Sequence, residues 1–261
     1  MEERKSVKVG DHIDLTGQVA IVTGGTRGLG RIIAETLVGA GAQVVVCGRN
    51  SPGDLPDGVT FRGADIRDPE EAKALVEATV AEHGRIDILV NNAGGSPHVE
   101  AATASPRFFD SIVRLNLGAP MYMAQAAFAH MRKAGSGNIV NIASVSGIRP
   151  SPGTAAYGAA KAGLLNLTQS LAQEWGPEGV RVNAIIAGLM QTETSELTYG
   201  GPEAQAAVGR SMPLQRMGKG EDIAGAVLWL CSGLATWVSG ARINVDGGGE
   251  RPYFLDLVKG E

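Results

Sequence analysis

A tyrosine and a lysine stand four residues apart, at Tyr157 and Lys161, in a segment whose pattern predicts a helix over 156–175. Side chains at this spacing share one helix face, so the ammonium can lie beside the phenol and lower its pKa toward a value useful for proton transfer. Ser144 follows a predicted strand over 138–142, at the end where ligands gather in parallel sheets. These residues predict acid–base chemistry, although a Tyr-x-x-x-Lys pattern alone is common on surface helices.

A glycine-rich segment, Thr23-Gly-Gly-Thr-Arg-Gly-Leu-Gly30, has the composition of a phosphate-binding turn. Its glycines let the backbone turn sharply and approach a pyrophosphate, and the following helix directs its first N–H groups at the anion. The same glycines could form a tight turn that binds nothing. The segment lies between an apolar run at 18–23 and an amphipathic pattern over 30–40, and this context favours a dinucleotide site.

The residue that reads the adenosine ribose is expected about 20 residues after such a loop, and it is normally acidic in proteins that bind NAD. Arg49 occupies this place. Arg27 and Arg49 together could bind a 2′-phosphate, so the sequence favours NADP, as NADPH in the reduced form, over NAD. Alternatively, either arginine could simply point to solvent, and Asp54 could restore an NAD site if its loop folds back.

Composition narrows the class of protein. The chain has 261 residues, 44% of them hydrophobic, and its net charge of −4 is spread without a charged block, which argues against nucleic acid as a partner. No segment approaches the 18 apolar residues of a membrane span. Cys47 and Cys231 are far apart, which fits reduced thiols in a cytoplasmic protein. The four histidines lack ligand spacing, so no metal is expected.

Apolar strands alternate with helical patterns along the chain. This alternation predicts a single-domain α/β fold of the Rossmann type, a doubly wound parallel sheet in a three-layer αβα arrangement, over residues 15–249. Residues 1–14 are expected to be a tail, 250–261 a C-terminal extension of open role, and the irregular segment at about 189–215 a lid over a ligand. The predicted strands are 18–23, 44–47, 59–61, 86–90, 138–142, 180–186 and 242–245; the predicted helices are 30–40, 69–83, 106–133, 156–175 and 221–232.

Five motifs occur in an order that resembles the short-chain dehydrogenase/reductase family, and within it the 3-oxoacyl-acyl carrier protein reductases. They are Thr-Gly-Gly-Thr-Arg-Gly-Leu-Gly at 23–30, Asn-Asn-Ala-Gly at 91–94, Leu-Asn-Leu at 115–117, Ser144, and Tyr157-Gly-Ala-Ala-Lys161. The resemblance extends from about residue 17 to 249. It implies hydride transfer between a nicotinamide cofactor and a carbonyl or secondary alcohol.

The resemblance also implies a role for each matching residue. Tyr157 would be the general acid/base, Lys161 would lower its pKa and hold the nicotinamide ribose, Ser144 would bind the substrate oxygen, and Asn116 would support a water relay to Lys161. Asp65 and Ile66 would meet the adenine. The full set of expected cofactor contacts is Gly24, Thr26, Arg27, Gly28, Leu29, Gly30, Arg49, Asp65, Ile66, Asn92, Ala93, Gly94, Tyr157, Lys161, Gly188, Leu189 and Thr192.

The chain departs from the family pattern after the sixth predicted strand, where Ala187-Gly188 replaces the usual Pro-Gly. The loss of proline removes a fixed φ from the loop that braces the nicotinamide. The apolar helix at 221–232 needs burial on several sides; the resemblance implies a homotetramer in which it packs across a subunit boundary, and the alternative is a fully internal helix.

The small-molecule substrate stays open among 3-oxoacyl thioesters, steroids and small ketones. Two other functions also stay open: an NAD-dependent secondary-alcohol dehydrogenase, and a non-catalytic nucleotide-binding sensor or scaffold.

Overall fold

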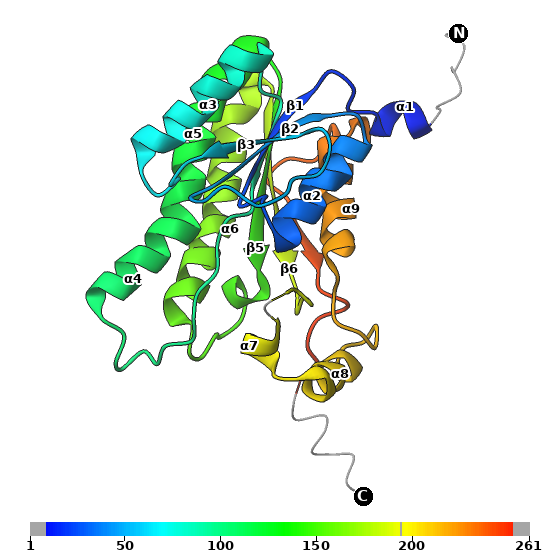
Figure 1. Cartoon of the computed structure of the whole chain (residues 1–261). Coiled ribbons are helices and arrows are strands. Elements are labelled where there is room, and N and C mark those ends of the chain that lie inside the picture. The colour runs from blue at the N-terminus through cyan, green and yellow to red at the C-terminus, as the bar shows by residue number, and fades with distance from the viewer. Residues whose placement is uncertain (1–8, 194, 253–261) are drawn as a thin grey trace, which may run out of the picture.

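Seven parallel strands form one sheet in the order β3-β2-β1-β4-β5-β6-β7 (Figure 1). The computed structural model describes residues 9–193 and 195–252. Helices cover both faces of the sheet, so the expected doubly wound αβα fold is confirmed. The strands are β1 Val19–Thr23, β2 Gln43–Gly48, β3 Val59–Gly63, β4 Ile88–Asn91, β5 Gly137–Ser144, β6 Val180–Ala187 and β7 Arg242–Val245.

The central strands are mostly apolar because helices pack on both of their faces. All residues of β1 and β4 are buried, whereas the edge strands β3 and β7 are only partly covered. Since every strand runs in the same direction, the carboxyl ends of β1, β4, β5 and β6 meet at one edge of the sheet. Chain order reverses between β1 and β4, and that switch point is where such sheets bind ligands.

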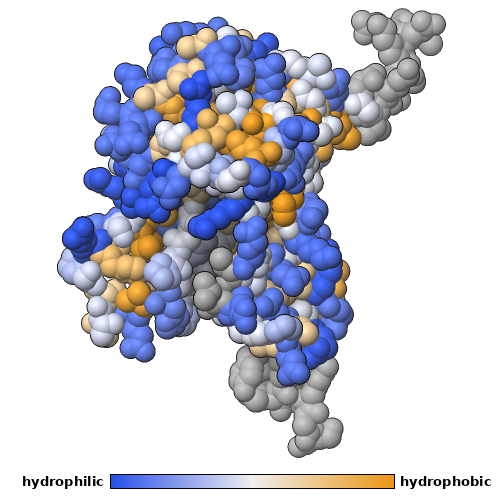
Figure 2. Space-filling view, viewed as in Figure 1, coloured by the Kyte–Doolittle hydropathy of each residue, from blue (hydrophilic) through white to orange (hydrophobic). Residues whose placement is uncertain are grey.

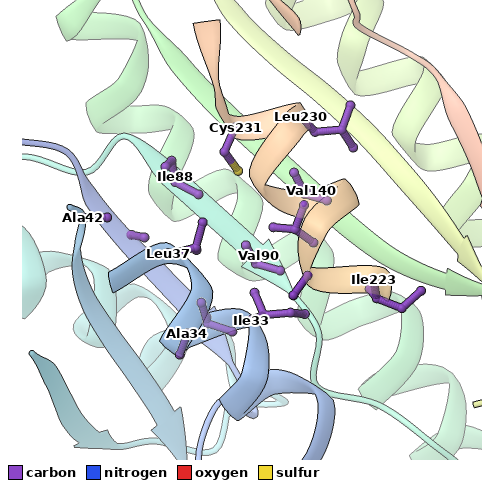
Figure 3. Packing of buried hydrophobic residues seen from close by; sticks show 14 of the residues in the cluster. Ile33, Ala34, Leu37, Ala42, Ile88, Val90, Val140, Ile223, Leu230 and Cys231 are labelled. Atoms are coloured by element: carbon purple, nitrogen blue, oxygen red, sulfur yellow. The ribbon is translucent and has the colours of Figure 1, made fainter. Parts of the chain in front are cut away.

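One face of the sheet is covered by α2 (Gly28–Gly39) and α9 (Gly220–Cys231), which pack against each other. Figure 3 shows Ile33 and Leu37 of α2 near Val90 of β4 and Val140 of β5, with Ile223 and Leu230 coming from α9. The other face is covered by α3 (Pro69–His83), α5 (Ala119–Ala134) and α6 (Ala155–Trp175).

Local signals explain where α3 begins and ends. The Asp68 carboxylate accepts the N–H of Glu70 at 2.8 Å, Pro69 occupies the first turn, and Gly84 ends the helix with a φ of 77°. The helix predicted over 106–133 is interrupted: α4 (Pro106–Val113) leads into a π-helical turn, Arg114–Gly118, before α5. Single π turns inside helices are frequent at functional sites.

Two segments are more ordered than their sequences indicate. Residues 9–13 of the expected tail form the short helix α1 (Val9–Ile13), which contacts the 3₁₀ turn Gly233–Ala235. The segment expected to be a lid contains α7 (Ser195–Tyr199) and α8 (Pro202–Ser211). Most of the 250–261 extension lies outside the described residues. Among the described helices, none is long and apolar enough to cross a membrane.

Candidate active site

Three of the expected catalytic side chains come from two elements. Ser144 is the last residue of β5, and its hydroxyl accepts the N–H of Ser146 at 3.2 Å. Tyr157 and Lys161 come from the first two turns of α6, which packs along β5 and β6. The Ser144 hydroxyl hydrogen-bonds the Tyr157 phenol, and the Lys161 Nζ lies 5.6 Å from the centre of the Tyr157 ring. The fold therefore brings the three residues together at the carboxyl edge of the sheet.

Lys161 is a buried ammonium with one backbone partner. Its side chain is only 4% exposed, and its Nζ donates to the Ile142 carbonyl at 2.7 Å. Burial disfavours the charged form and lowers the pKa of Lys161 from 10.5 to about 8. This amine can therefore change its protonation state a little above neutral pH.

The pKa of Tyr157 is shifted opposite to the direction that the Lys161 spacing predicts. Burial raises it, the hydrogen bond with Ser144 lowers it, and the nearby Tyr199 phenol raises it further. Removal of the phenolate from water outweighs the stabilisation that this site provides. The Tyr157 phenol consequently keeps its proton at neutral pH.

Asn116 connects the π turn to the loop after β4. Its amide nitrogen donates to the Ile112 carbonyl at 2.9 Å and to the Gly95 carbonyl at 3.0 Å, and its Oδ1 accepts the Gly95 N–H at 2.9 Å. A Cβ at Gly94 would lie 2.6 Å from the Asn116 Oδ1 and 3.2 Å from the Lys161 Nζ. Glycine at this position thus lets the loop pass directly over Asn116 and Lys161.

The glycine-rich loop is joined to the same segment by Thr23, the last residue of β1. The Thr23 Oγ1 accepts the N–H groups of Asn92 and Ala93, both at 3.0 Å, and the Asn92 amide donates to the Thr23 carbonyl at 2.9 Å. A Cβ at Gly30 would lie 2.3 Å from the Gly24 carbonyl oxygen, so only glycine allows α2 to start this close to the loop.

The start of α2 fits the pyrophosphate of a dinucleotide. Among the described residues no side chain caps its first N–H groups, in contrast to α3. Gly28, with a φ of 53°, has open space where a Cβ would be, and Leu29 follows it at the start of the helix. Thr26 lies against Gly48 at the end of β2. Exposed helix N–H groups beside open space are the features that an anionic group needs.

The residues expected around the adenosine form a charged cluster. Arg49 follows β2 and acts electrostatically on Asp65, whose pKa is lowered chiefly by its hydrogen bonds with Arg67. The Arg67 Nε donates to the two Asp65 carboxylate oxygens at 2.8 and 3.1 Å. Within the described part of the chain, the side chains of Arg27 and Arg49 have no hydrogen bond or ion pair.

Asp54, the residue that could restore an NAD site, pairs with an arginine of α2. Its carboxylate pairs with Arg31 of α2 at 2.8 Å and is largely exposed. Arg67 is a residue of this region that sequence reasoning missed, although its place two residues after Asp65 was visible. Ile66, between them, is buried.

The loop after β6 carries the remaining expected cofactor contacts, Gly188, Leu189 and Thr192. The Gly188 N–H donates to the Val245 carbonyl at 3.0 Å, and the Gly218 N–H donates to the Leu189 carbonyl at 2.9 Å. A cavity of about 270 Å³ lies behind this loop, between it, β7 and the start of α9, and it is lined by Met190, Met212, Asp222 and Asp246 among others. None of the four expected catalytic residues lines this cavity.

Tyr199 of α7 is a second aromatic residue near Tyr157. Electrostatic interactions connect it to Tyr157, Glu250 and Arg149. The Arg149 and Glu250 side chains pair with each other across 101 positions of sequence, with the Arg149 Nη2 donating to a Glu250 oxygen at 2.8 Å. Figure 2 shows the surface hollowed between the side that carries α4 and the side that carries α7 and α8.

Comparison with known proteins identifies the family of this chain. A family model described as Enoyl-(Acyl carrier protein) reductase matches residues 24–250. The 3-oxoacyl-[acyl-carrier-protein] reductase FabG of Chlamydia muridarum is 36% identical over 244 residues, covering 90% of this chain and 98% of that protein. Dehydrogenase/reductase SDR family member 4 of Homo sapiens is 34% identical, covering 90% of this chain and 88% of that protein.

A solved structure shares the whole fold. The ligand-free aldohexose dehydrogenase of Thermoplasma acidophilum superposes with a TM-score of 0.86 at 31% identity, covering 91% of this chain and 95% of that one. The names of these relatives all denote dehydrogenases or reductases. The chain belongs to the short-chain dehydrogenase/reductase family of nicotinamide-dependent oxidoreductases that act on carbonyl and alcohol groups.

Proposed function

We propose that this protein is an NADP(H)-dependent oxidoreductase that interconverts a carbonyl and a secondary alcohol, with Tyr157 as general acid/base. The observation that carries the proposal is the convergence of Ser144, Tyr157, Lys161 and Asn116 at one edge of the sheet. A non-catalytic sensor would have no need of a complete proton-transfer set at its nucleotide site.

The nicotinamide cofactor, when bound, supplies or accepts the hydride. In the reduction direction, the Ser144 hydroxyl donates a hydrogen bond to the substrate carbonyl oxygen and orients it toward Tyr157. The Tyr157 phenol gives its proton to that oxygen as the carbonyl carbon gains the hydride, and the product is the alcohol. Burial holds this phenol protonated, which suits a proton donor.

Lys161 and Asn116 would restore the proton. The Lys161 ammonium, with a pKa of about 8, can pass a proton toward the Tyr157 phenolate, and Asn116 fixes the Gly94–Gly95 backbone beside it. The net reaction consumes one carbonyl, one hydride and one proton.

The NADP preference rests on Arg27 and Arg49. Both guanidiniums lack a hydrogen-bonded carboxylate within the described residues, while the nearby Asp65 is neutralised by Arg67 and Asp54 is paired with Arg31. A 2′-phosphate would supply charge-assisted partners for both free arginines.

The substrate class to test first is the 3-oxoacyl thioester, because relatives are named as 3-oxoacyl-[acyl-carrier-protein] reductases. Steroids and small ketones are the other two classes. Both cysteines are buried and unpaired, and burial raises the pKa of the Cys47 thiol to about 11, which fits the cytoplasmic location that we propose.

We also propose a homotetramer. α9 buries one side against α2 and the sheet, but β7 leaves an open sheet edge beside it, and the Trp237 side chain is 99% exposed. An open edge and an exposed tryptophan are features that a subunit interface would cover. Sedimentation equilibrium tests this directly: a tetrameric mass is expected, and a monomer at micromolar concentration would contradict it.

The functional test is fluorescence titration of the purified protein with NADPH and NADH, followed by turnover with a panel of 3-oxoacyl thioesters, steroids and small ketones. Tighter binding of NADPH and NADPH oxidation with one carbonyl class are expected. Tighter binding of NADH would overturn the arginine argument, and no binding of either would favour the sensor or scaffold.

A further inference from the structure

The loop after β6 has lost the proline that the family pattern places at 187, yet its backbone is held on both sides. On one side, the Gly218 N–H donates to the Leu189 carbonyl at 2.9 Å and the Gln191 N–H donates to the Gly218 carbonyl at 2.8 Å. Residues 189 and 191 are thus bound as in a short parallel strand, with Met190 and Gly218 forming the bridge. The backbone N–H and carbonyl of Met190 itself therefore point away from Gly218.

The Met190 carbonyl and N–H face residues of α7. The Ser195 hydroxyl donates to the Met190 carbonyl at 3.3 Å and accepts the Thr192 N–H at 2.5 Å. At the other end of α7, the Tyr199 phenol lies near the Met190 N–H, which lowers the pKa of that phenol. Ser195 is only 3% exposed, so its hydroxyl has little access to water and depends on these protein partners.

We propose that Ser195 and Tyr199 are positioning residues that fix the backbone at Met190 and so replace the missing proline as the brace for the nicotinamide. A proline at 187 would restrict one φ angle. Here the Ser195 hydroxyl holds the Met190 carbonyl, and the Tyr199 phenol lies near the Met190 N–H. Tyr199 also lies near Tyr157 and acts electrostatically on it. This inference rests on the proposed function, because it assigns the loop to the nicotinamide half of the cofactor.

The experiment compares a whole cofactor with its adenosine half. Wild type, Ser195→Ala, Tyr199→Phe and the double variant are titrated with NADPH and with adenosine 2′,5′-bisphosphate, which lacks the nicotinamide. Ser211→Ala is the matched control, because the Ser211 hydroxyl bonds the Val208 carbonyl within α8 and does not touch the loop. Ser195→Thr keeps the hydroxyl and serves as the conservative rescue.

A hydrogen bond is worth about 1 kcal/mol, which corresponds to about a fivefold change in Kd. Each single variant is expected to weaken NADPH about fivefold and the double variant about 20-fold, while affinity for the bisphosphate stays within about twofold. Ser195→Thr should restore most of the loss, and Ser211→Ala should change neither ligand. Hydrogen exchange of the ligand-free protein should show faster exchange of the Met190 amide in Tyr199→Phe.

Three results would overturn the inference: unchanged NADPH affinity in the double variant, equal weakening of both ligands, or an unchanged Met190 amide in Tyr199→Phe. A wild type that binds NADH more tightly overturns the NADP proposal but leaves this inference intact, and the titration is then repeated with NADH against ADP. A wild type that binds no dinucleotide overturns both.

Discussion

Substitution of Gly94 by alanine tests whether Asn116 and Lys161 are held as tightly as the geometry indicates. The new Cβ would lie 2.6 Å from the Asn116 Oδ1 and 3.2 Å from the Lys161 Nζ, well inside ordinary contact. Asn116 is completely buried and is fixed by hydrogen bonds to Gly95 and Ile112, so it cannot move without breaking them. The strain has to appear as lost stability or as a displaced site.

The magnitude follows from the bonds at stake. Loss of two of the three Asn116 hydrogen bonds, at about 1 kcal/mol each, lowers the free energy of unfolding by about 2 kcal/mol. For a domain of this size that corresponds to a fall in Tm of about 4–8 °C. Turnover should fall as well, because Asn116 and the Lys161 ammonium shift relative to Tyr157.

The assay is urea unfolding and thermal melting of Gly94→Ala, with carbonyl reduction measured in parallel. Gly225→Ala is the matched control: it lies inside α9, and a Cβ there would meet nothing within 4 Å. It should raise stability by about 0.5–1 kcal/mol through helix propensity. A Gly94→Ala protein with wild-type stability and turnover would refute the reasoning.

Three further predictions concern charge. Arg49→Asp should shift the NADPH-to-NADH affinity ratio toward NADH by at least about tenfold, because two charge-assisted hydrogen bonds are lost. Asp54→Asn should leave the ratio unchanged, because Asp54 pairs with Arg31. Both variants are titrated with the two cofactors, and an unchanged ratio in Arg49→Asp would contradict the prediction. Arg216 lowers the pKa of Asp222 from 3.8 to about 2, so this pair stabilises the fold above pH 3.8 and loses its effect as the pH falls through 2. Acid unfolding should therefore show a smaller loss of stability across this window in Asp222→Asn than in wild type. Equal losses in the two proteins would show that the pair contributes nothing to stability. The kcat/KM for reduction should fall as the pH rises through about 8, where buried Lys161 loses its proton, and a profile flat to pH 10 would contradict this role.

Strand positions and sheet type could be predicted because they depend on hydrophobic periodicity. The apolar run at 18–23 became the fully buried β1, and the pattern over 156–175 became α6 with Tyr157 and Lys161 on one side. The break at residues 114–118 could not be predicted, because the 3.6-residue period continues through it. The π turn contains the buried Asn116, whose amide bonds both the Ile112 carbonyl of α4 and the backbone of Gly95.

Electrostatic detail was the least predictable from sequence. The spacing of Tyr157 and Lys161 correctly indicated proximity but gave the wrong direction for the Tyr157 pKa, because spacing carries no information on burial. The pairing of Arg149 with Glu250 joins residues 101 positions apart, and only the closed fold brings them together. Proximity in sequence thus indicates which side chains can meet, while the surrounding packing decides their charge.

The central claim, that Tyr157 is the group that transfers the proton, is tested most directly by the Tyr157→Phe variant. NADPH affinity and the rate of carbonyl reduction are measured on the same preparation, with the substrate found for the wild type. The account predicts an unchanged Kd for NADPH, because the ring that packs against Lys161 is kept, together with a loss of kcat of at least about a hundredfold. A variant that binds NADPH and reduces the carbonyl at the wild-type rate would contradict the claim.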